Sequence, residues 1–308
     1  MSAISRRPEA DPLYARPLPQ RAAYATGMLL DAQDFADEQT YHRGRLARAV
    51  LFGTGSGTLA GLAVTHRPES DGQAEEIQVA PGIAVDGIGR LVEIPRPACL
   101  RLTRWFAGET DRDGGDTLRR AALDSLAPFV GPRLQPPGAL PARAVVADVY
   151  LRFVSCENGL TPSFAAGPFD ALDAVAPSRL RDAYELHMIA RSDGLDMDNP
   201  DPTRRFTGLP DLGPDLADTA DMGQRRAELQ DFILGAYPVS GTAGMAGAIP
   251  RPAGHPPDLD PTAVFLARVL IPVGLADPPQ RTDEVVRIDN FSRRFVPSAT
   301  LLARWVGA

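Results

Sequence analysis

The segment Val145-Val146-Ala147-Asp148-Val149-Tyr150-Leu151-Arg152-Phe153-Val154 carries the clearest strand pattern in the sequence. Its odd-numbered residues are all apolar, whereas its even-numbered residues include Asp148 and Arg152. An apolar residue at every second position is typical of a β-strand that turns one face to a core. We therefore expect a strand over residues 145–154.

The same period of two recurs on both sides of this segment. Apolar runs at 83–85 and 91–94 flank the turn Asp86-Gly87-Ile88-Gly89 and predict a β-hairpin, with Asp-Gly supplying the positive φ of the turn. Further apolar, strand-like runs lie at 59–64, 77–79, 184–190, 264–271 and 285–288. Irregular loops separate these runs and few helices could cross over between them. We expect an α+β, mainly β fold with an antiparallel sheet or β-sandwich core.

One amphipathic helix is predicted near the N-terminus. Asp31 is the expected N-cap, Asp34 completes an acidic variant of the capping box, and Gly53 is a natural stop. One helical stripe of this segment holds Phe35, His42, Leu46, Ala49 and Val50. Three shorter helices are expected, at 117–126, at 221–234 and from a Ser298 cap to Val306.

Clusters among the 30 prolines and 28 glycines divide the chain. The polar, Arg- and Pro-bearing residues 1–26 predict an extended N-terminal anchor laid along a neighbour. Residues 27–52 hold the amphipathic helix, and residues 53–192 and 262–308 the β-rich core. Residues 193–261 predict a partly helical, Gly/Ala/Pro-rich irregular insertion.

Composition narrows the class of protein. A formal net charge of −7 over 308 residues offers no bulk surface for nucleic acid, and all 32 Lys-or-Arg positions are arginine. No run approaches the roughly 18 apolar residues of a membrane span, and no N-terminal stretch has the pattern of a secretory signal, so we expect none. Cys99 and Cys156 are too few for a disulfide framework, and we expect buried thiols in a reducing compartment.

Several motifs suggest chemistry, and each has a simpler structural interpretation. Gly53-Thr54-Gly55-Ser56-Gly57 follows a helix and precedes a strand, the reverse of a nucleotide-binding loop, and Ser56 does not lie in a nucleophile elbow. Glu38 and His42, at i and i+4, could share a metal, but a packed or hydrogen-bonded histidine is the favoured interpretation.

Two acidic stretches are also best interpreted as solvated loops or turns. Residues 193–201 hold Asp193, Asp196, Asp198, Asn199 and Asp201 without EF-hand spacing, and residues 111–116 are typical of turns. No nucleophile has a neighbouring base by spacing. We therefore assign no catalytic, cofactor-binding or metal-binding residue and no cofactor, and we expect that the protein is not an enzyme.

Residues 27–102 and the C-terminal region carry a set of motifs spread over roughly 120 residues. The first group is Gly27-Met28-Leu29-Leu30-Asp31-Ala32-Gln33-Asp34-Phe35, Glu38-Gln39-Thr40-Tyr41-His42-Arg43, Gly61-Leu62-Ala63-Val64, Val79-Ala80-Pro81-Gly82-Ile83-Ala84-Val85-Asp86 and Gly89-Arg90-Leu91-Val92. The second is Phe265-Leu266-Ala267-Arg268-Val269, Ile288-Asp289-Asn290 and Arg293-Arg294. As a set they resemble a family of uncharacterised proteins encoded beside sheath, tube and baseplate genes in phages and bacterial contractile injection systems. The chain departs from the family at Phe52 and Thr54, where relatives more often carry a histidine and an aromatic residue, and residues 104–261 lie outside the resemblance.

The resemblance implies a structural subunit of a phage tail or phage-tail-like contractile particle, in the baseplate, tail-tip or fibre-attachment region. Such a protein would be assembled in the bacterial cytoplasm into a virion or particle, as a symmetric homo-oligomer in contact with other tail or baseplate subunits. The alternative is a receptor- or carbohydrate-binding module at the distal end of the tail, with Trp105, Phe106 and Tyr237 as candidate aromatic platforms. A third possibility is a hydrolase with a dispersed carboxylate site, which no sequence motif supports.

Overall fold

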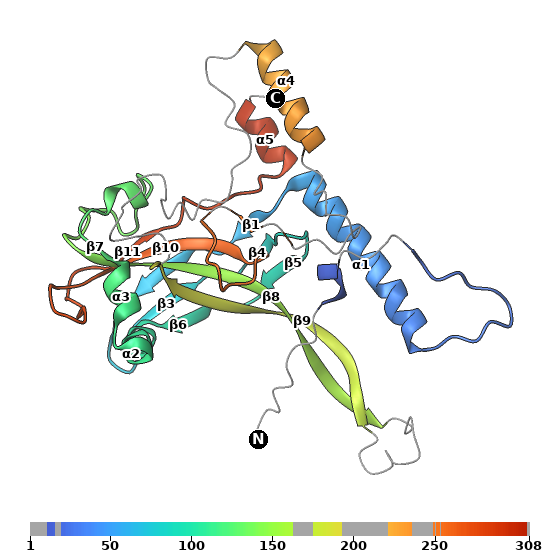
Figure 1. Ribbon diagram of the computed structural model, residues 1–308, viewed down its shortest axis with the longest axis horizontal. Helices are drawn as coiled ribbons and strands as arrows, with labels where there is room; N and C mark the ends of the chain where they lie inside the picture. Colours follow the sequence, from blue (N-terminus) through green and yellow to red (C-terminus); the bar gives the residue numbers. More distant parts are fainter. Residues whose placement is uncertain are drawn as a thin grey trace.

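The computed structural model describes residues 11–15, 20–162, 175–192, 221–235, 249, 251–252 and 254–306. They form the α+β, mainly β architecture that the sequence predicts, with antiparallel sheets (Figure 1). The helices are η1 (Pro12–Ala15), α1 (Ala32–Thr54), α2 (Leu102–Asp113), α3 (Asp116–Ala121), η2 (Ala127–Phe129), α4 (Met222–Gly235) and α5 (Ala299–Val306). The strands are β1 (Gly57–Gly61), β2 (Val64–Arg67), β3 (Glu76–Val79), β4 (Gly82–Val85), β5 (Leu91–Ile94), β6 (Ala98–Arg101), β7 (Ala122–Leu123), β8 (Ala144–Pro162), β9 (Val175–Ala190), β10 (Val264–Pro272) and β11 (Arg287–Asp289).

The strands form three sheets. Two small sheets have the orders β1-β4-β5 and β2-β3-β6, and the largest has the order β11-β10-β8-β7, with β9 also paired to β8. The predicted strand over 145–154 is confirmed within β8, where Val149 lies opposite Ala267 of β10 and opposite Met188 of β9. The chain therefore builds its body around β8.

The core lies on both sides of β8. The odd-numbered residues from Val145 to Phe153 all join the main apolar cluster, as the alternation predicts, together with residues of α2 and α3. The opposite face is covered as well, because Val146 and Tyr150 lie in two smaller buried clusters. Burial on both faces explains why Asp148, an even-numbered residue, has no exposed surface.

The predicted hairpin is confirmed as β4 and β5, which pair Val85 with Leu91. The Asp86 side chain accepts hydrogen bonds from the backbone N–H groups of Ile88 and Arg90 (3.0 and 2.8 Å) and so closes the turn. The expectation that Asp-Gly supplies the positive φ is wrong, because Gly89, at φ +95°, takes that conformation instead. The turn spans more residues than a two-residue hairpin, which moves the left-handed position along the chain.

Helix α1 begins as predicted, with Asp31 and Asp34 forming a reciprocal capping box. Its predicted apolar stripe, however, faces outward: the side chains of Phe35 and Leu46 are 54% and 61% exposed. The helix instead contacts the body through the small residues of its opposite face, and Ala47 is its one buried residue. Small side chains let two backbones approach closely. The surface through which α1 contacts the body therefore contains few of the large apolar side chains of the helix.

Helix α2 lies where the sequence predicts only irregular structure. Its buried positions Leu102, Phe106 and Glu109 follow the spacing of a helix face. The helix predicted over 117–126 is shorter than expected, because α3 ends at Ala121 and the chain enters β7. The other predicted helices are confirmed as α4 and α5, and the Ser298 side chain accepts a hydrogen bond from the Leu301 N–H.

The cysteine expectation is wrong, because Cys99 and Cys156 are both exposed and free. Cys99 lies on β6, where burial alternates along the strand, and Cys156 lies where β8 has left the body. Although each cysteine lies in or beside an apolar stretch of the sequence, neither thiol is in the core.

Two expected domain limits are also corrected. Residues 11–15, placed in an extended anchor by the sequence, pack against the body, and Asp11 and Leu13 are buried. At the other limit, Leu259 belongs to a buried cluster with Tyr150 and Phe265, so the end of the expected insertion is part of the core. Most of residues 193–250 lie outside the described residues, apart from α4 and residue 249.

Glu75 gives the folded state a pH dependence. Burial by itself raises the pKa of Glu75, but hydrogen bonds and charges from Arg281 and His66 outweigh it and lower the pKa from 4.5 to about 2. The folded-state pKa lies below the ordinary value, so this contribution to stability is present above about pH 4.5 and is lost as the pH falls toward 2. We expect Glu75→Gln to be less stable than wild type at pH 6, with a difference that shrinks by pH 3, in urea titrations. Equal differences at both pH values would contradict this assignment.

Candidate functional site

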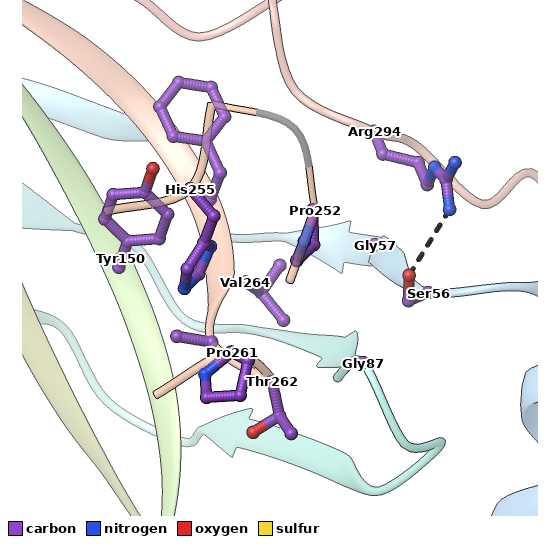
Figure 2. A pocket seen from close by; sticks show the side chains of 12 residues that line it. Ser56, Gly57, Gly87, Tyr150, Pro252, His255, Pro261, Thr262, Val264 and Arg294 are labelled. Carbon is purple, nitrogen blue, oxygen red and sulfur yellow. Dashed lines mark hydrogen bonds between the residues drawn. The ribbon is translucent and has the colours of Figure 1, made fainter. Parts of the chain in front are cut away.

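A pocket lies where α1 passes into β1, beside the β4–β5 turn and the segment that leads into β10 (Figure 2). It is an open pocket with about 470 Å³ of empty space, a figure that includes solvent at its mouth. Its lining consists of Ser56, Gly57, Gly87, Tyr150, Pro252, His255, Pro261, Thr262, Ala263, Val264, Phe265 and Arg294. The chemistry of the pocket therefore depends on the hydroxyls of Ser56, Tyr150 and Thr262 and on the side chains of His255 and Arg294.

The polar groups of this pocket are engaged within the protein. His255 Nε2 lies 2.8 Å from the Asp260 carbonyl oxygen, and burial lowers the pKa of His255, which favours the neutral ring at pH 7. The hydroxyl of Tyr150 accepts a hydrogen bond from Arg191 (3.3 Å), and Ser56 Oγ accepts one from Arg294 (3.4 Å). Ser56 thus faces a guanidinium and not a base, and the Thr262 hydroxyl donates to the Asp260 carboxylate at 2.8 Å.

The other residues that the sequence singled out fall into structural roles. His42 and Glu38 contact each other at 2.8 Å on the exposed surface of α1, as the hydrogen-bonded interpretation predicts. Asp113 accepts hydrogen bonds from Thr117, which lower the pKa of Asp113, and residues 111–116 form the end of α2 and the turn into α3. Across the part of the chain that the structure describes, no three His, Cys, Asp or Glu side chains gather in a way that could hold a metal ion. Residues 193–201 lie outside that part.

The candidate aromatic platforms are used for packing. Trp105 donates from its indole nitrogen to the Met188 carbonyl oxygen at 2.7 Å, and its ring packs against the main core. Phe106 is buried in that core. Tyr237 lies outside the described residues. The two aromatics that can be placed therefore do not form an exposed stacking surface.

A buried polar junction around Arg90 fixes α1 on the body. The Arg90 guanidinium donates to Asp86 (2.7 Å), Asp11 (2.9 Å) and Thr262 (3.1 Å). Arg43 of α1 donates to the same Asp11 carboxylate at 2.8 Å. Four separate parts of the chain, namely residue 11 before η1, α1, the β4–β5 turn and the entry to β10, therefore meet at one arginine.

Arginine–carboxylate contacts of this kind hold a rigid geometry. Although burial lowers the pKa of Arg90, the Asp86 charge and the hydrogen bonds of its neighbours raise the pKa above its ordinary value, so the side chain stays charged. The ring of Phe153 also lies 4.3 Å from the guanidinium carbon. No residue pattern around Arg90 predicts this role, and its place in the motif Gly89-Arg90-Leu91-Val92 is the one signal in the sequence.

The C-terminal motif fastens the two small sheets. The Asn290 side-chain amide donates to the Val64 carbonyl oxygen and accepts from the Val64 N–H, both at 2.8 Å, as a neighbouring strand would. Arg293 donates to the Leu62 carbonyl oxygen at 2.8 Å. Burial lowers the pKa of Arg293 to about 10, so it remains charged at neutral pH. Asn290 and Arg293, like Arg90, are thus scaffold residues.

Large apolar side chains remain exposed on three helices. They are Phe35, Leu46 and Phe52 on α1, Met222, Leu229, Phe232, Ile233 and Leu234 on α4, and Leu301 and Leu302 on α5. In Figure 1 these helices lie outside the sheets that form the body. Exposed clusters of several large apolar side chains mark surfaces that bind other molecules. None of the helices in the described ranges has the length and apolar character of a bilayer span.

Comparisons with known proteins add no family: the sequence matches no protein-family model, and no curated protein matches it either.

Proposed function

We propose that this protein is a structural subunit of a phage tail or phage-tail-like contractile particle. Its place would be in the baseplate, tail-tip or fibre-attachment region, and its partners other tail or baseplate subunits and further copies of itself. The resemblance of residues 27–102 and of the C-terminal motifs supports this class. The structural observation that carries the proposal is a long two-stranded arm that leaves the body.

The arm is formed by the distal halves of β8 and β9. Its pairs continue past Ser155–Asp182 and Cys156–Arg181 to the ends of both strands. The body strand β10 reaches only to Leu151 on β8, and among the described residues no other strand pairs with the arm (Figure 1). Residues 156–159 and 178–182 are exposed, including Leu180 at 67%.

A two-stranded ribbon is marginally stable in water by itself. Ordering such an arm adds little stability to an isolated chain. In a particle subunit the same arm is a rigid extension that a neighbouring subunit can bind. The part of β8 that lies within the body is held firmly, because two arginines bind the buried Asp148 there. The combination of a rigid base and an uncovered arm fits a subunit that reaches into an adjacent protein.

Shortening the arm tests the proposal. We expect a variant in which Asn-Gly replaces residues 157–180 to fold with an unchanged unfolding midpoint, because no side chain that the structure describes in that span is buried. The same variant should be absent from particles purified from the native host, as judged by mass spectrometry of their components. Leu275→Ser is the matched control, because Leu275 is 88% exposed outside the arm, and it should be incorporated normally.

Two outcomes would count against the proposal in different ways. Absence of the wild-type protein from purified particles would remove the particle role altogether. Normal incorporation of the shortened variant would leave that role in place and exclude the arm as its means of attachment. The receptor- or carbohydrate-binding alternative gains no support from Trp105 or Phe106, since both pack into the body.

A further inference from the structure

We propose that α1 pairs antiparallel with α1 of a second copy of this chain, along its exposed stripe. The contacts that carry this inference are independent of the particle role, because they concern the helix and its own charges. The pairing would make a two-fold symmetric dimer in which each helix covers the apolar side chains of the other.

The exposed stripe has the spacing of a coiled-coil seam. It consists of Phe35, Gln39, His42, Leu46, Ala49 and Gly53, in steps of four and three residues. All six residues are exposed. A repeat of 3.5 residues keeps one face of a helix against a partner helix over its length, and the apolar members supply the contact. Phe52, 53% exposed, widens the apolar surface at the C-terminal end of the stripe.

Within the described residues, the contacts of α1 with the body are made by the opposite face of the helix and leave this stripe exposed. A Cβ atom on Gly89 would lie 1.9 Å from the Ala47 carbonyl oxygen, so the β4–β5 turn touches the helix backbone there. A Cβ on Gly44 would lie 3.3 Å from the Leu13 side chain. Arg43 is tied to Asp11 on the same side. These contacts fix the rotation of the helix and direct the stripe outward.

The charges of α1 select a second copy as the partner and an antiparallel orientation. The first half of the helix and its cap carry Asp31, Asp34, Asp37 and Glu38, and residues 22–42 contain no arginine. The second half carries Arg45 and Arg48, besides Arg43, which is paired with Asp11, and residues 39–68 contain no acidic residue. Antiparallel pairing sets the acidic half of each copy against the basic half of the other, whereas parallel pairing sets like charges together. The helix dipoles also favour the antiparallel arrangement.

Side-chain sizes agree with this orientation. When two copies cross at His42, Phe35 of one copy faces Ala49 of the other. Glu38 then lies beside Arg45 of the second copy, and Asp37 lies near its Arg48. A large side chain meets a small one at both ends of the seam, which allows the two helices to pack closely. A helix of 23 residues is about 34 Å long, enough for the seam from Phe35 to Ala49 to lie against the second copy.

The oligomeric state of the isolated protein tests the inference. We expect wild-type protein to form a concentration-dependent dimer in sedimentation equilibrium. Leu46→Asp should raise the dimer dissociation constant by at least about 10-fold, because a charge would be buried in the middle of the seam. Leu275→Asp is the matched control, since Leu275 is 88% exposed far along the chain, and it should dimerise like wild type. Both variants should retain the wild-type circular dichroism spectrum.

Single cysteines distinguish the orientations, in a Cys99→Ser/Cys156→Ser background. His42→Cys should form a disulfide-linked dimer by itself, because the two copies cross nearby. Phe35→Cys should not, since antiparallel helices separate its two copies by more than about 20 Å, but it should cross-link when mixed with Ala49→Cys. A disulfide-linked Phe35→Cys dimer would show parallel pairing and overturn the proposal. A wild-type monomer at high concentration, or a dimer that Leu46→Asp leaves intact, would also overturn it.

Discussion

Replacing Asp148 with alanine is expected to lower the free energy of unfolding by about 3–5 kcal/mol. The Asp148 carboxylate is fully buried on β8 and accepts hydrogen bonds from Arg268 (2.7 and 2.9 Å) and from Arg191 (2.7 Å). Although burial raises the pKa of Asp148, the charges and hydrogen bonds of the two arginines outweigh it and hold the pKa below its ordinary value. Alanine would leave two buried guanidinium groups without the carboxylate between them.

Denaturant titration at neutral pH measures this loss, and two variants bracket it. Asp148→Asn keeps the size and one acceptor oxygen but removes the charge, so we expect a smaller loss than for alanine. Glu185→Ala removes the partner of Arg152 from a partly exposed pair on the neighbouring strands, and should cost less than about 1 kcal/mol. A loss of that small size for Asp148→Ala would mean that the clamp does not hold the body together.

Gly89→Ala is expected to destabilise the protein strongly and to release α1 from the body. Gly89 has φ +95°, and an added Cβ would meet the Ala47 backbone at 1.9 Å. Two costs therefore add: about 1–2 kcal/mol for a non-glycine residue in a left-handed conformation, and roughly 1–3 kcal/mol for overpacking. The backbone of α1 cannot move aside without breaking the Arg90 junction, so the clash has no inexpensive relief.

Gly72→Ala separates the two costs. Gly72 has φ +80°, but an added Cβ there would have no atom within 4 Å. We expect this variant to show the conformational cost alone, and Gly89→Ala to be less stable than Gly72→Ala by about 1–3 kcal/mol in the same titration. Equal effects would show that the turn and the helix do not press against each other. Limited proteolysis before Ala47 should also become faster in Gly89→Ala only.

Much of the local structure was predictable from short stretches. The alternation from Val145 to Phe153 predicts β8, the Asp86–Gly89 segment predicts the β4–β5 hairpin, and the Asp31 cap predicts the start of α1. Helix α2 was missed although its buried positions Leu102 and Phe106 have helical spacing. The nearby glycines and aspartates outweighed that spacing in a prediction made from the sequence.

The two surfaces proposed to bind other molecules, the β8–β9 arm and the apolar stripe of α1, were less predictable from the sequence. The arm extends the strand predicted at 145–154 well past Val154, and the polar composition of its distal part gave no strand signal. The apolar stripe of α1 was recognised, but an apolar stripe normally faces the core of its own chain. Nothing in the pattern indicates that Gly44 and Ala47 take that role and leave Phe35 and Leu46 exposed.

Local order in this protein follows from its sequence, because side-chain period, capping groups and turn residues act over a few neighbouring positions. Which groups meet across long separations was settled only when the chain packed. Asp148 joins Arg191 and Arg268 across 43 and 120 positions, and Arg90 joins Asp11 across 79. Each of those partners lies in or beside a strand, in a turn or near the N-terminus, and its position depends on the whole core. The outward direction of α1 has the same origin, since the backbone contact between Gly89 and Ala47 allows the helix one rotation.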